Sequence, residues 1–144
     1  MIIKKIEMAD SVSISEIEKS CFSDLSWSLE QIQSHLKNNS GIAIYSVKII
    51  GYLLFLENPY EIEILRLGVS PKERNKGYST ILISELCKTG KEIFLEVSSL
   101  NLTALQLYKK CGFEMISERK KYYTDGSDAL VLKKNPRQSA NPIF

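Results

Sequence analysis

Histidine and cysteine are scarce in this sequence of 144 residues. His35 is the one histidine, so a metal site built on two histidines is excluded, and any nucleophile triad that needs a histidine must use this residue. The cysteines, Cys21, Cys87 and Cys111, are widely spaced and form no C-x-x-C pair, which argues against a zinc ribbon or a redox pair. We therefore expect no metal, and chemistry that depends on the backbone, carboxylates, tyrosines and a bound cofactor.

Long hydrophobic runs are also missing. The longest purely apolar run, Tyr52–Leu56, is far shorter than the roughly 20 residues that a membrane helix needs. The N-terminal segment Met1–Glu7 has no long apolar core after a basic start, so we expect no signal peptide. An odd number of cysteines without such a signal fits a reducing cytosol, and we expect a cytoplasmic protein with no membrane partner.

Neither sign of charge dominates. Nineteen Lys and Arg residues against seventeen Asp and Glu residues give a formal net charge of +2. This balance excludes a nucleic-acid binder that depends on bulk positive charge, so we expect no nucleic-acid partner, although a local basic patch is still allowed. A length of 144 residues, with 44% hydrophobic and 25% charged residues, is typical of one soluble globular domain.

Hydrophobic periodicity predicts elements in the order β, α, α, β, β, β, α, β, α, β, β. The clearest helix start is Ser28, because Gln31 follows three residues later and completes a capping box. The first half lacks strand–helix alternation, which excludes a doubly wound dinucleotide fold and predicts a mixed α/β sheet with helices on its faces. The predicted strands are 2–6, 42–47, 50–56, 61–69, 92–97, 113–123 and 129–133, and the predicted helices begin at Asp10 or Ser11, Ser28, Gly77 and Asn101.

The segment from Leu67 to Thr80 predicts a strand, a short basic loop and the start of a helix. Backbone N–H groups at a helix start form an anion site, and Gly77 lets the backbone approach an anion closely. Lys72, Arg74 and Lys76 add positive charge, although the segment has neither a P-loop nor a G-x-G-x-x-G motif. By itself this pattern fits a phosphate-binding loop and a solvated basic turn equally well.

A second segment contains Glu96, which interrupts an otherwise apolar strand, and a helix with Asn101 as its cap and Tyr108 about two turns later. Glu96 is either a functional carboxylate or an ordinary solvent-facing strand residue. Tyr108 stands at helical spacing from Ala104 and Leu105, so it fits a core position as well as a site position.

Together the two segments resemble the GCN5-related N-acetyltransferase (GNAT) superfamily. The pattern R-x-x-G-x-S at residues 74–79 resembles its acyl-CoA pyrophosphate loop, usually [QR]-x-x-G-x-[GA]. The pattern N-x-x-A-x-x-x-Y at residues 101–108, closed by G-F, resembles its second motif. S-W-S at 26–28, L-E-V at 95–97 and K-Y-Y…D-G-S-D-A at 121–129 resemble the RimI type, bacterial enzymes that acetylate the N-terminal alanine of the eighteenth protein of the small ribosomal subunit.

The resemblance implies a GNAT fold, with a single mixed, mostly antiparallel sheet of about seven strands flanked by about four helices. We expect residues 1–134 to form the acetyltransferase domain and residues 135–144 a flexible tail, since the tail has two prolines and little apolar content.

The resemblance also implies acetyl-CoA as cosubstrate, a protein N-terminus as acceptor, and direct transfer in a ternary complex. Glu96 would accept the proton of the amine, and Tyr108 would protonate the departing CoA thiolate. Trp27, Tyr122 and Tyr123 would line the acceptor groove, although Trp27 also fits a packing role beside the helix cap at Ser28. The implied acetyl-CoA contacts are Leu67, Gly68, Val69, Arg74, Asn75, Lys76, Gly77, Tyr78, Ser79, Thr80 and Asn101.

Some residues depart from the family pattern, and alternatives stay open. Ser79 stands where glycine or alanine is usual, Ser98 where an arginine is frequent, and Ser26 where a proline precedes the tryptophan. The rival acceptors are polyamines, aminoglycosides and other small amines, which a strongly acidic pocket would favour, and the rival class is a non-catalytic acyl-CoA-binding module. We expect His35 to be an exposed helix residue and the cysteines to be buried small hydrophobes, and the sequence leaves the oligomeric state open.

Overall fold

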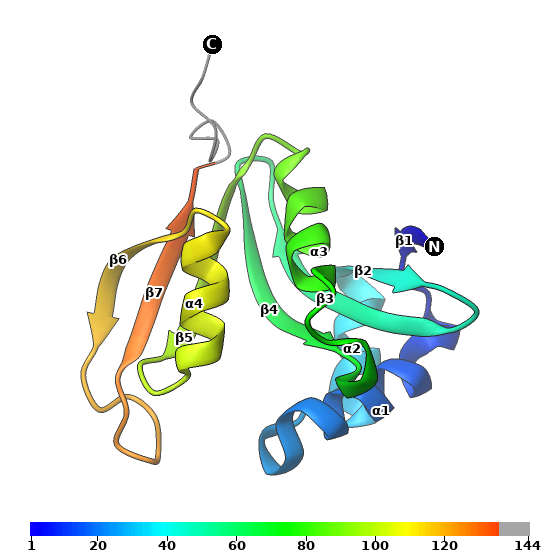
Figure 1. Ribbon diagram of the computed structural model, residues 1–144, viewed down its shortest axis with the longest axis horizontal. Coiled ribbons are helices and arrows are strands. Elements are labelled where there is room, and N and C mark those ends of the chain that lie inside the picture. The colour runs from blue at the N-terminus through cyan, green and yellow to red at the C-terminus, as the bar shows by residue number, and fades with distance from the viewer. Residues whose placement is uncertain (136–144) are drawn as a thin grey trace. The chain divides into compact units, whose positions relative to one another are not determined.

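The computed structural model of the protein describes residues 1–135, and within them the predicted order of strands and α-helices is confirmed (Figure 1). The strands are β1 (Ile2–Lys5), β2 (Ser40–Tyr45), β3 (Ile49–Glu57), β4 (Glu61–Val69), β5 (Glu92–Ser98), β6 (Glu114–Arg119) and β7 (Ala129–Lys134). The α-helices are α1 (Ser11–Phe22), α2 (Leu29–Asn38), α3 (Tyr78–Cys87) and α4 (Leu102–Lys110). Short 3₁₀ turns cover Met8–Asp10, Ser23–Leu25 and Pro71–Glu73.

The strands form one sheet in the order β1-β2-β3-β4-β5-β7-β6. β4 and β5 run parallel, with Glu61 opposite Glu92, while β1 and β2, β2 and β3, β5 and β7, and β6 and β7 pair antiparallel. The predicted mixed, mostly antiparallel sheet is therefore confirmed. None of the helices within residues 1–135 is long and apolar enough to cross a membrane.

Contacts divide the chain into two compact units, each with its own core. Among the described residues, the first unit holds 1–57 and 64–84, and the second holds 58–63 and 85–135. The tail that the sequence predicts from Asn135 lies, beyond Asn135 itself, outside the described residues.

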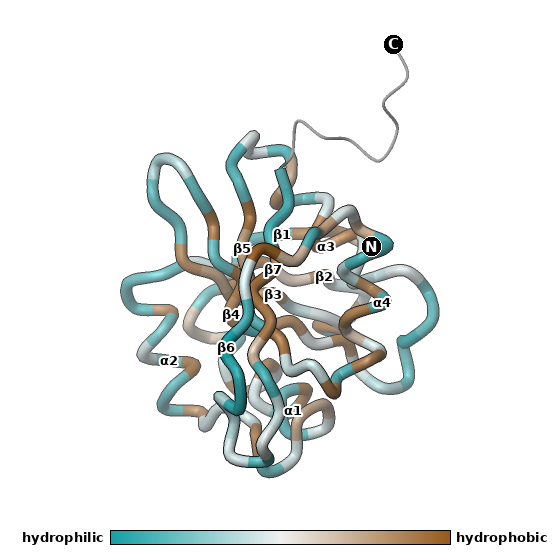
Figure 2. Tube along the Cα trace, turned by 90° about the vertical axis from the view of Figure 1, so that its left-hand side faces the viewer, coloured by the Kyte–Doolittle hydropathy of each residue, from teal (hydrophilic) through white to brown (hydrophobic). Residues whose placement is uncertain are grey.

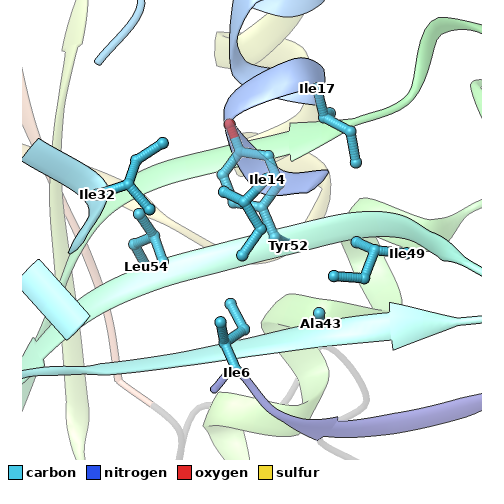
Figure 3. Close-up of a cluster of buried hydrophobic side chains, with 8 residues drawn as sticks. All are labelled: Ile6, Ile14, Ile17, Ile32, Ala43, Ile49, Tyr52 and Leu54. Atoms are coloured by element: carbon cyan, nitrogen blue, oxygen red, sulfur yellow. The ribbon is translucent and has the colours of Figure 1, made fainter. Parts of the chain in front are cut away.

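The core of the first unit lies between α1, α2 and the strands β2 and β3. Figure 3 shows the ring of Tyr52 from β3 among isoleucines of both helices, with its hydroxyl oxygen directed toward α1. Ile14 and Ile17 share one face of α1 because they are three residues apart, and burying each contributes about 1.5–3 kcal/mol relative to an exposed side chain. The cluster consists of Ile6, Ile14, Ile17, Ile32, Ala43, Ile49, Tyr52 and Leu54.

The helix starts follow local hydrogen bonding. Ser28 Oγ accepts from the Gln31 N–H at 3.1 Å, and Gln31 Oε1 accepts from the Ser28 N–H at 2.8 Å, so the predicted capping box of α2 is confirmed. In Figure 2 the trace of α2 mixes teal and brown residues, as an amphipathic helix should. Asp10 precedes α1 but does not cap it with its side chain, because its carboxylate accepts from the Glu7 N–H at 2.8 Å.

His35 is not the exposed residue that the sequence analysis expects. It is 6% exposed, and its Nε2 lies 2.9 Å from the carbonyl oxygen of Ser40. Since a carbonyl only accepts, the imidazole must donate this hydrogen bond. His35 lies three residues after Ile32 on the buried stripe of α2, which explains why a polar residue is buried there.

Three smaller expectations are also wrong. β2 ends at Tyr45 rather than at Val47, because Val47 stands fully exposed at the tip of the β2–β3 turn with a φ of 53°. The strand predicted for 113–123 ends at Arg119, where the chain turns toward β7. The three cysteines are half-buried rather than buried, and Cys21 Sγ donates to the Val69 carbonyl oxygen at 3.4 Å.

In the second unit β7 pairs with β5 on one side and with β6 on the other (Figure 1). Ile93, Leu95 and Val97 alternate along β5 and are buried on one face. The ring of Tyr108 from α4 is 9% exposed and meets the ring of Phe113 edge to face at 5.5 Å. This arrangement leaves the other face of β5 for Glu96.

Candidate active site

The loop that follows β4 turns sharply before α3 begins. Asn75 and Gly77 both have left-handed backbone conformations, with φ angles of 64° and 82°. The first N–H groups of α3 have no partner within the helix, and turns of this kind form concavities that bind anions. A Cβ atom on Gly77 would meet nothing within 4 Å, so the space in front of this backbone is open.

The basic side chains of this loop have protein partners. Arg74 Nε donates to the Val69 carbonyl oxygen at 3.4 Å, which holds the loop against the end of β4. Lys76 Nζ lies 2.9 Å from the Glu73 carboxylate, and this hydrogen bond raises the pKa of Lys76 above its usual range. The loop therefore presents backbone N–H groups, with lysine and arginine charges at its rim.

Gly68 in β4 is required by packing in the first unit. A Cβ atom there would lie 2.7 Å from the hydroxyl oxygen of Tyr52, a distance that real side chains do not tolerate. The neighbouring predicted residues differ in exposure, since Val69 is buried and Leu67 is half-buried. The Tyr52 ring alone therefore explains why residue 68 is a glycine.

A buried ion pair that the sequence analysis missed holds the α1–α2 connection to β4. Glu18 is fully buried, and Arg66 donates to it from Nε at 3.0 Å and from Nη2 at 2.7 Å. Tyr52 Oη donates to the same carboxylate at 2.5 Å, and the Trp27 N–H donates at 2.6 Å. Removing one partner of such a pair typically costs about 3–5 kcal/mol. The one feature of the sequence that could have indicated this ion pair is the position of Glu18, four residues after Ile14 on the apolar face of α1.

This network fixes Trp27 in the first unit. Its backbone is bound to Glu18, and its half-buried ring lies 5.6 Å from the Arg66 guanidinium and 5.8 Å from the His35 ring. The packing role that the sequence analysis left open for Trp27 is thus present.

Glu96 occupies the open face of β5 in the second unit. Leu95 and Val97 on either side are buried, while the Glu96 side chain is 32% exposed. Its Oε1 lies 3.7 Å from Nε of Arg119, at the end of β6. The Arg119 guanidinium lies 5.2 Å from the centre of the Tyr122 ring.

Two of the predicted substrate residues are linked to this carboxylate, Tyr122 through the Arg119 guanidinium and Tyr123 through the charge of Glu96. The rings of Tyr122 and Tyr123 meet edge to face at 5.3 Å. Burial, followed by the charge of Glu96, raises the pKa of Tyr123, so its phenol stays neutral. We call Glu96, Arg119, Tyr122 and Tyr123 the Glu96 cluster.

Serine hydroxyls hold the turn after Tyr123. Ser98 Oγ donates to Ser127 Oγ at 2.8 Å, so the residue that departs from the family pattern has a structural contact here. Asp125 accepts from both the N–H and the hydroxyl of Ser127, and these hydrogen bonds lower the pKa of Asp125. The turn is therefore fixed from two sides.

Asn101 and Tyr108 lie at the two ends of one helix in the second unit. Asn101 Oδ1 accepts from the Ala104 N–H at 3.1 Å, so the predicted cap of α4 is confirmed. Tyr108 has its ring in the core, as one of the two interpretations of its spacing predicts.

The predicted site residues thus divide between the units. Trp27, the end of β4 and the loop belong to the first unit, while Asn101, Tyr108 and the Glu96 cluster belong to the second. Sequence reasoning missed Arg119, because its contact with Glu96 joins residues from β6 and β5 that are distant in sequence. Within residues 1–135 no group of three or more His, Cys, Asp or Glu side chains is arranged to hold a metal ion.

Comparisons with known proteins agree on one family. A sequence profile described as "Acetyltransferase (GNAT) family" matches residues 10–113. The N-alpha-acetyltransferase RimI of Mycobacterium tuberculosis is 34% identical over 87 residues, which cover 58% of this chain and 53% of that protein. A putative ribosomal protein bS18-alanine N-acetyltransferase of Bacillus subtilis is 30% identical over 141 residues, covering 90% of this chain and 92% of that protein.

The fold has a close match among solved structures. The ribosomal-protein-S18-alanine N-acetyltransferase from Escherichia coli superposes with a TM-score of 0.85 at 22% identity, over 99% of this chain and 98% of that one. The chain spans about half the length, or less, of the first curated relatives it matches. The profile match covers most of the chain, and the relatives include RimI-type proteins. The chain therefore belongs to the acetyltransferase (GNAT) family.

Proposed function

We propose that the protein transfers an acetyl group from acetyl-CoA to the N-terminal α-amino group of a protein, and that the acceptor is the N-terminal alanine of a small-subunit ribosomal protein. The observation that carries this proposal is the half-exposed carboxylate of Glu96 on an open strand face, paired with Arg119 and linked by its charge to Tyr123, in a chain of this family. The likeness to the N-alpha-acetyltransferase RimI of M. tuberculosis and to the putative bS18-alanine N-acetyltransferase of B. subtilis supports an α-amino acceptor. A cytoplasmic location stays a prediction.

The acceptor chemistry follows from the need for a neutral amine. An α-amino group has a reference pKa of about 7.7–8.0 and a lysine about 10.4, so the α-amine costs roughly 3 kcal/mol less to deprotonate at a given pH. Glu96 takes this proton, directly or through a water molecule. The amine nitrogen then attacks the thioester carbonyl, so that the C–N bond forms as the C–S bond breaks.

Apart from Asn101, the residues proposed to bind acetyl-CoA belong to the first unit. Backbone N–H groups from Asn75 to Thr80 hold the diphosphate of acetyl-CoA, with Arg74 and Lys76 supplying charge. Residues Leu67–Val69 contact the pantetheine arm, and an N–H group near Val69 stabilises the developing oxyanion. Asn101 contacts the coenzyme through atoms other than Oδ1, which caps α4.

The leaving group needs a proton, and Tyr108 supplies it to the CoA thiolate. The burial of its ring is compatible with this role, because a buried tyrosine packs its ring and directs its hydroxyl to a polar partner. The nucleophile comes from the acceptor, so the enzyme needs no cysteine or serine of its own.

A thiol-release assay with acetyl-CoA tests the proposal. An alanine-first peptide is expected to release CoA, while the same peptide with a blocked N-terminus and free spermidine should release little. Equal release with spermidine would favour the rival small-amine enzyme. Binding of acetyl-CoA without release from any amine would favour the non-catalytic module.

A further inference from the structure

The Glu96 cluster contains a positive charge that a general base does not require. Arg119 Nε lies 3.7 Å from Glu96 Oε1, too far for a hydrogen bond but within ion-pair range. The Arg119 side chain is 58% exposed, and its guanidinium faces the Tyr122 ring at 5.2 Å. Glu96 and Tyr122 therefore orient a solvent-accessible cation beside the carboxylate.

Lys120, the residue after Arg119, does not share this position. Lys120 Nζ lies 3.1 Å from Glu118 and 3.5 Å from Asp128, so its charge is directed to other carboxylates. The phenol of Tyr123 is neutral, since burial and the Glu96 charge raise its pKa. Glu96 and Arg119 together carry a net charge near zero, whereas Glu96 alone carries −1.

This balance affects amines according to their charge. A polyamine or a lysine side chain arrives as an ammonium ion, which a lone carboxylate attracts and a nearby guanidinium repels. Near pH 8 a larger fraction of α-amino groups than of lysine side chains is neutral. The guanidinium therefore weakens the binding of an α-amine less than the binding of a polyamine or a lysine side chain.

We propose that Arg119 is a specificity-determining residue that disfavours polyamines and lysine side chains relative to peptide α-amines. The inference rests on the proposed function of Glu96 as proton acceptor. For exposed charges, the expected size is roughly a two- to fivefold change in selectivity. Salt should reduce the change, because it screens exposed charges.

The test compares kcat/KM for an alanine-first peptide without lysine with kcat/KM for spermidine. In R119Q the peptide-to-spermidine ratio is expected to fall roughly two- to fivefold, chiefly because spermidine improves. R119K should restore most of the ratio, since it keeps the charge. K120Q is the matched control, because it removes the adjacent exposed charge whose partners are Glu118 and Asp128.

An unchanged ratio in R119Q, or an equal fall in K120Q, would overturn the inference. Failure of the proposed function gives a different result, because the wild-type protein would then release CoA equally with spermidine and the peptide, or with neither. Calorimetric binding of spermidine in the presence of CoA gives a second readout that does not depend on turnover. Tighter binding to R119Q than to wild type is expected, and equal binding would contradict the role of Arg119.

Discussion

Replacing Glu96 with glutamine is expected to lower kcat/KM for an alanine-first peptide by about 10²–10⁴-fold, the usual contribution of a general base. Glutamine has nearly the same shape and keeps the hydrogen-bonding capacity, but it cannot take the proton of the amine. Affinity for acetyl-CoA should stay nearly unchanged, because the coenzyme loop is on a different part of the chain. Steady-state kinetics with thiol detection, together with calorimetric titration of acetyl-CoA, measure both quantities.

The matched control for this variant is Glu92→Gln. Glu92 is also in β5, four residues earlier and on the same face, where its carboxylate lies 2.5 Å from Lys133 Nζ. Its replacement removes an exposed charge from the same strand and should leave turnover within about twofold. If Glu96→Gln keeps wild-type activity from low to high pH, Glu96 is not the base.

Gly77→Glu is expected to abolish acetyl-CoA binding at concentrations that saturate the wild-type protein. The substitution places a side chain and a negative charge in the open space where the diphosphate is proposed to bind, and like charges brought together cost several kcal/mol. A loss of about a hundredfold or more in affinity follows from that cost. Calorimetric titration with acetyl-CoA measures it.

Gly90→Glu is the matched control, which separates the loss of acetyl-CoA binding in Gly77→Glu from the effect of backbone strain. Gly90 has a φ of 78°, close to the 82° of Gly77, and a Cβ atom there also meets nothing within 4 Å. Both variants force a non-glycine residue into the left-handed region, which costs about 1–2 kcal/mol, but Gly90 follows the end of α3 rather than preceding its start. Equal acetyl-CoA affinity in Gly77→Glu and wild type would exclude the proposed loop.

Features encoded by neighbouring residues are the ones that the sequence predicted well. The capping box of Ser28 and Gln31 and the cap by Asn101 depend on residues three positions apart, so their patterns are visible without the fold. The order of elements follows from hydrophobic periodicity, which is also local.

Features made by distant residues were missed. The carboxylate of Glu18 meets Arg66 across 48 positions of sequence, and Glu96 of β5 meets Arg119 of β6 across the intervening strand β7. The glycine at position 68 is explained by the Tyr52 ring, which comes from another strand. Glu96 itself was predicted as a candidate, but its partners required the pairing of β5, β7 and β6 to bring Arg119 and the tyrosines to it.

A crystal structure of the protein with coenzyme A and an alanine-first peptide tests the central claim most directly. The proposal predicts that the diphosphate contacts the backbone N–H groups between Asn75 and Thr80, and that the Glu96 carboxylate faces both the thiol and the peptide amine. A coenzyme bound away from this loop, or a Glu96 carboxylate turned to the opposite side of the sheet from the thiol, would contradict it.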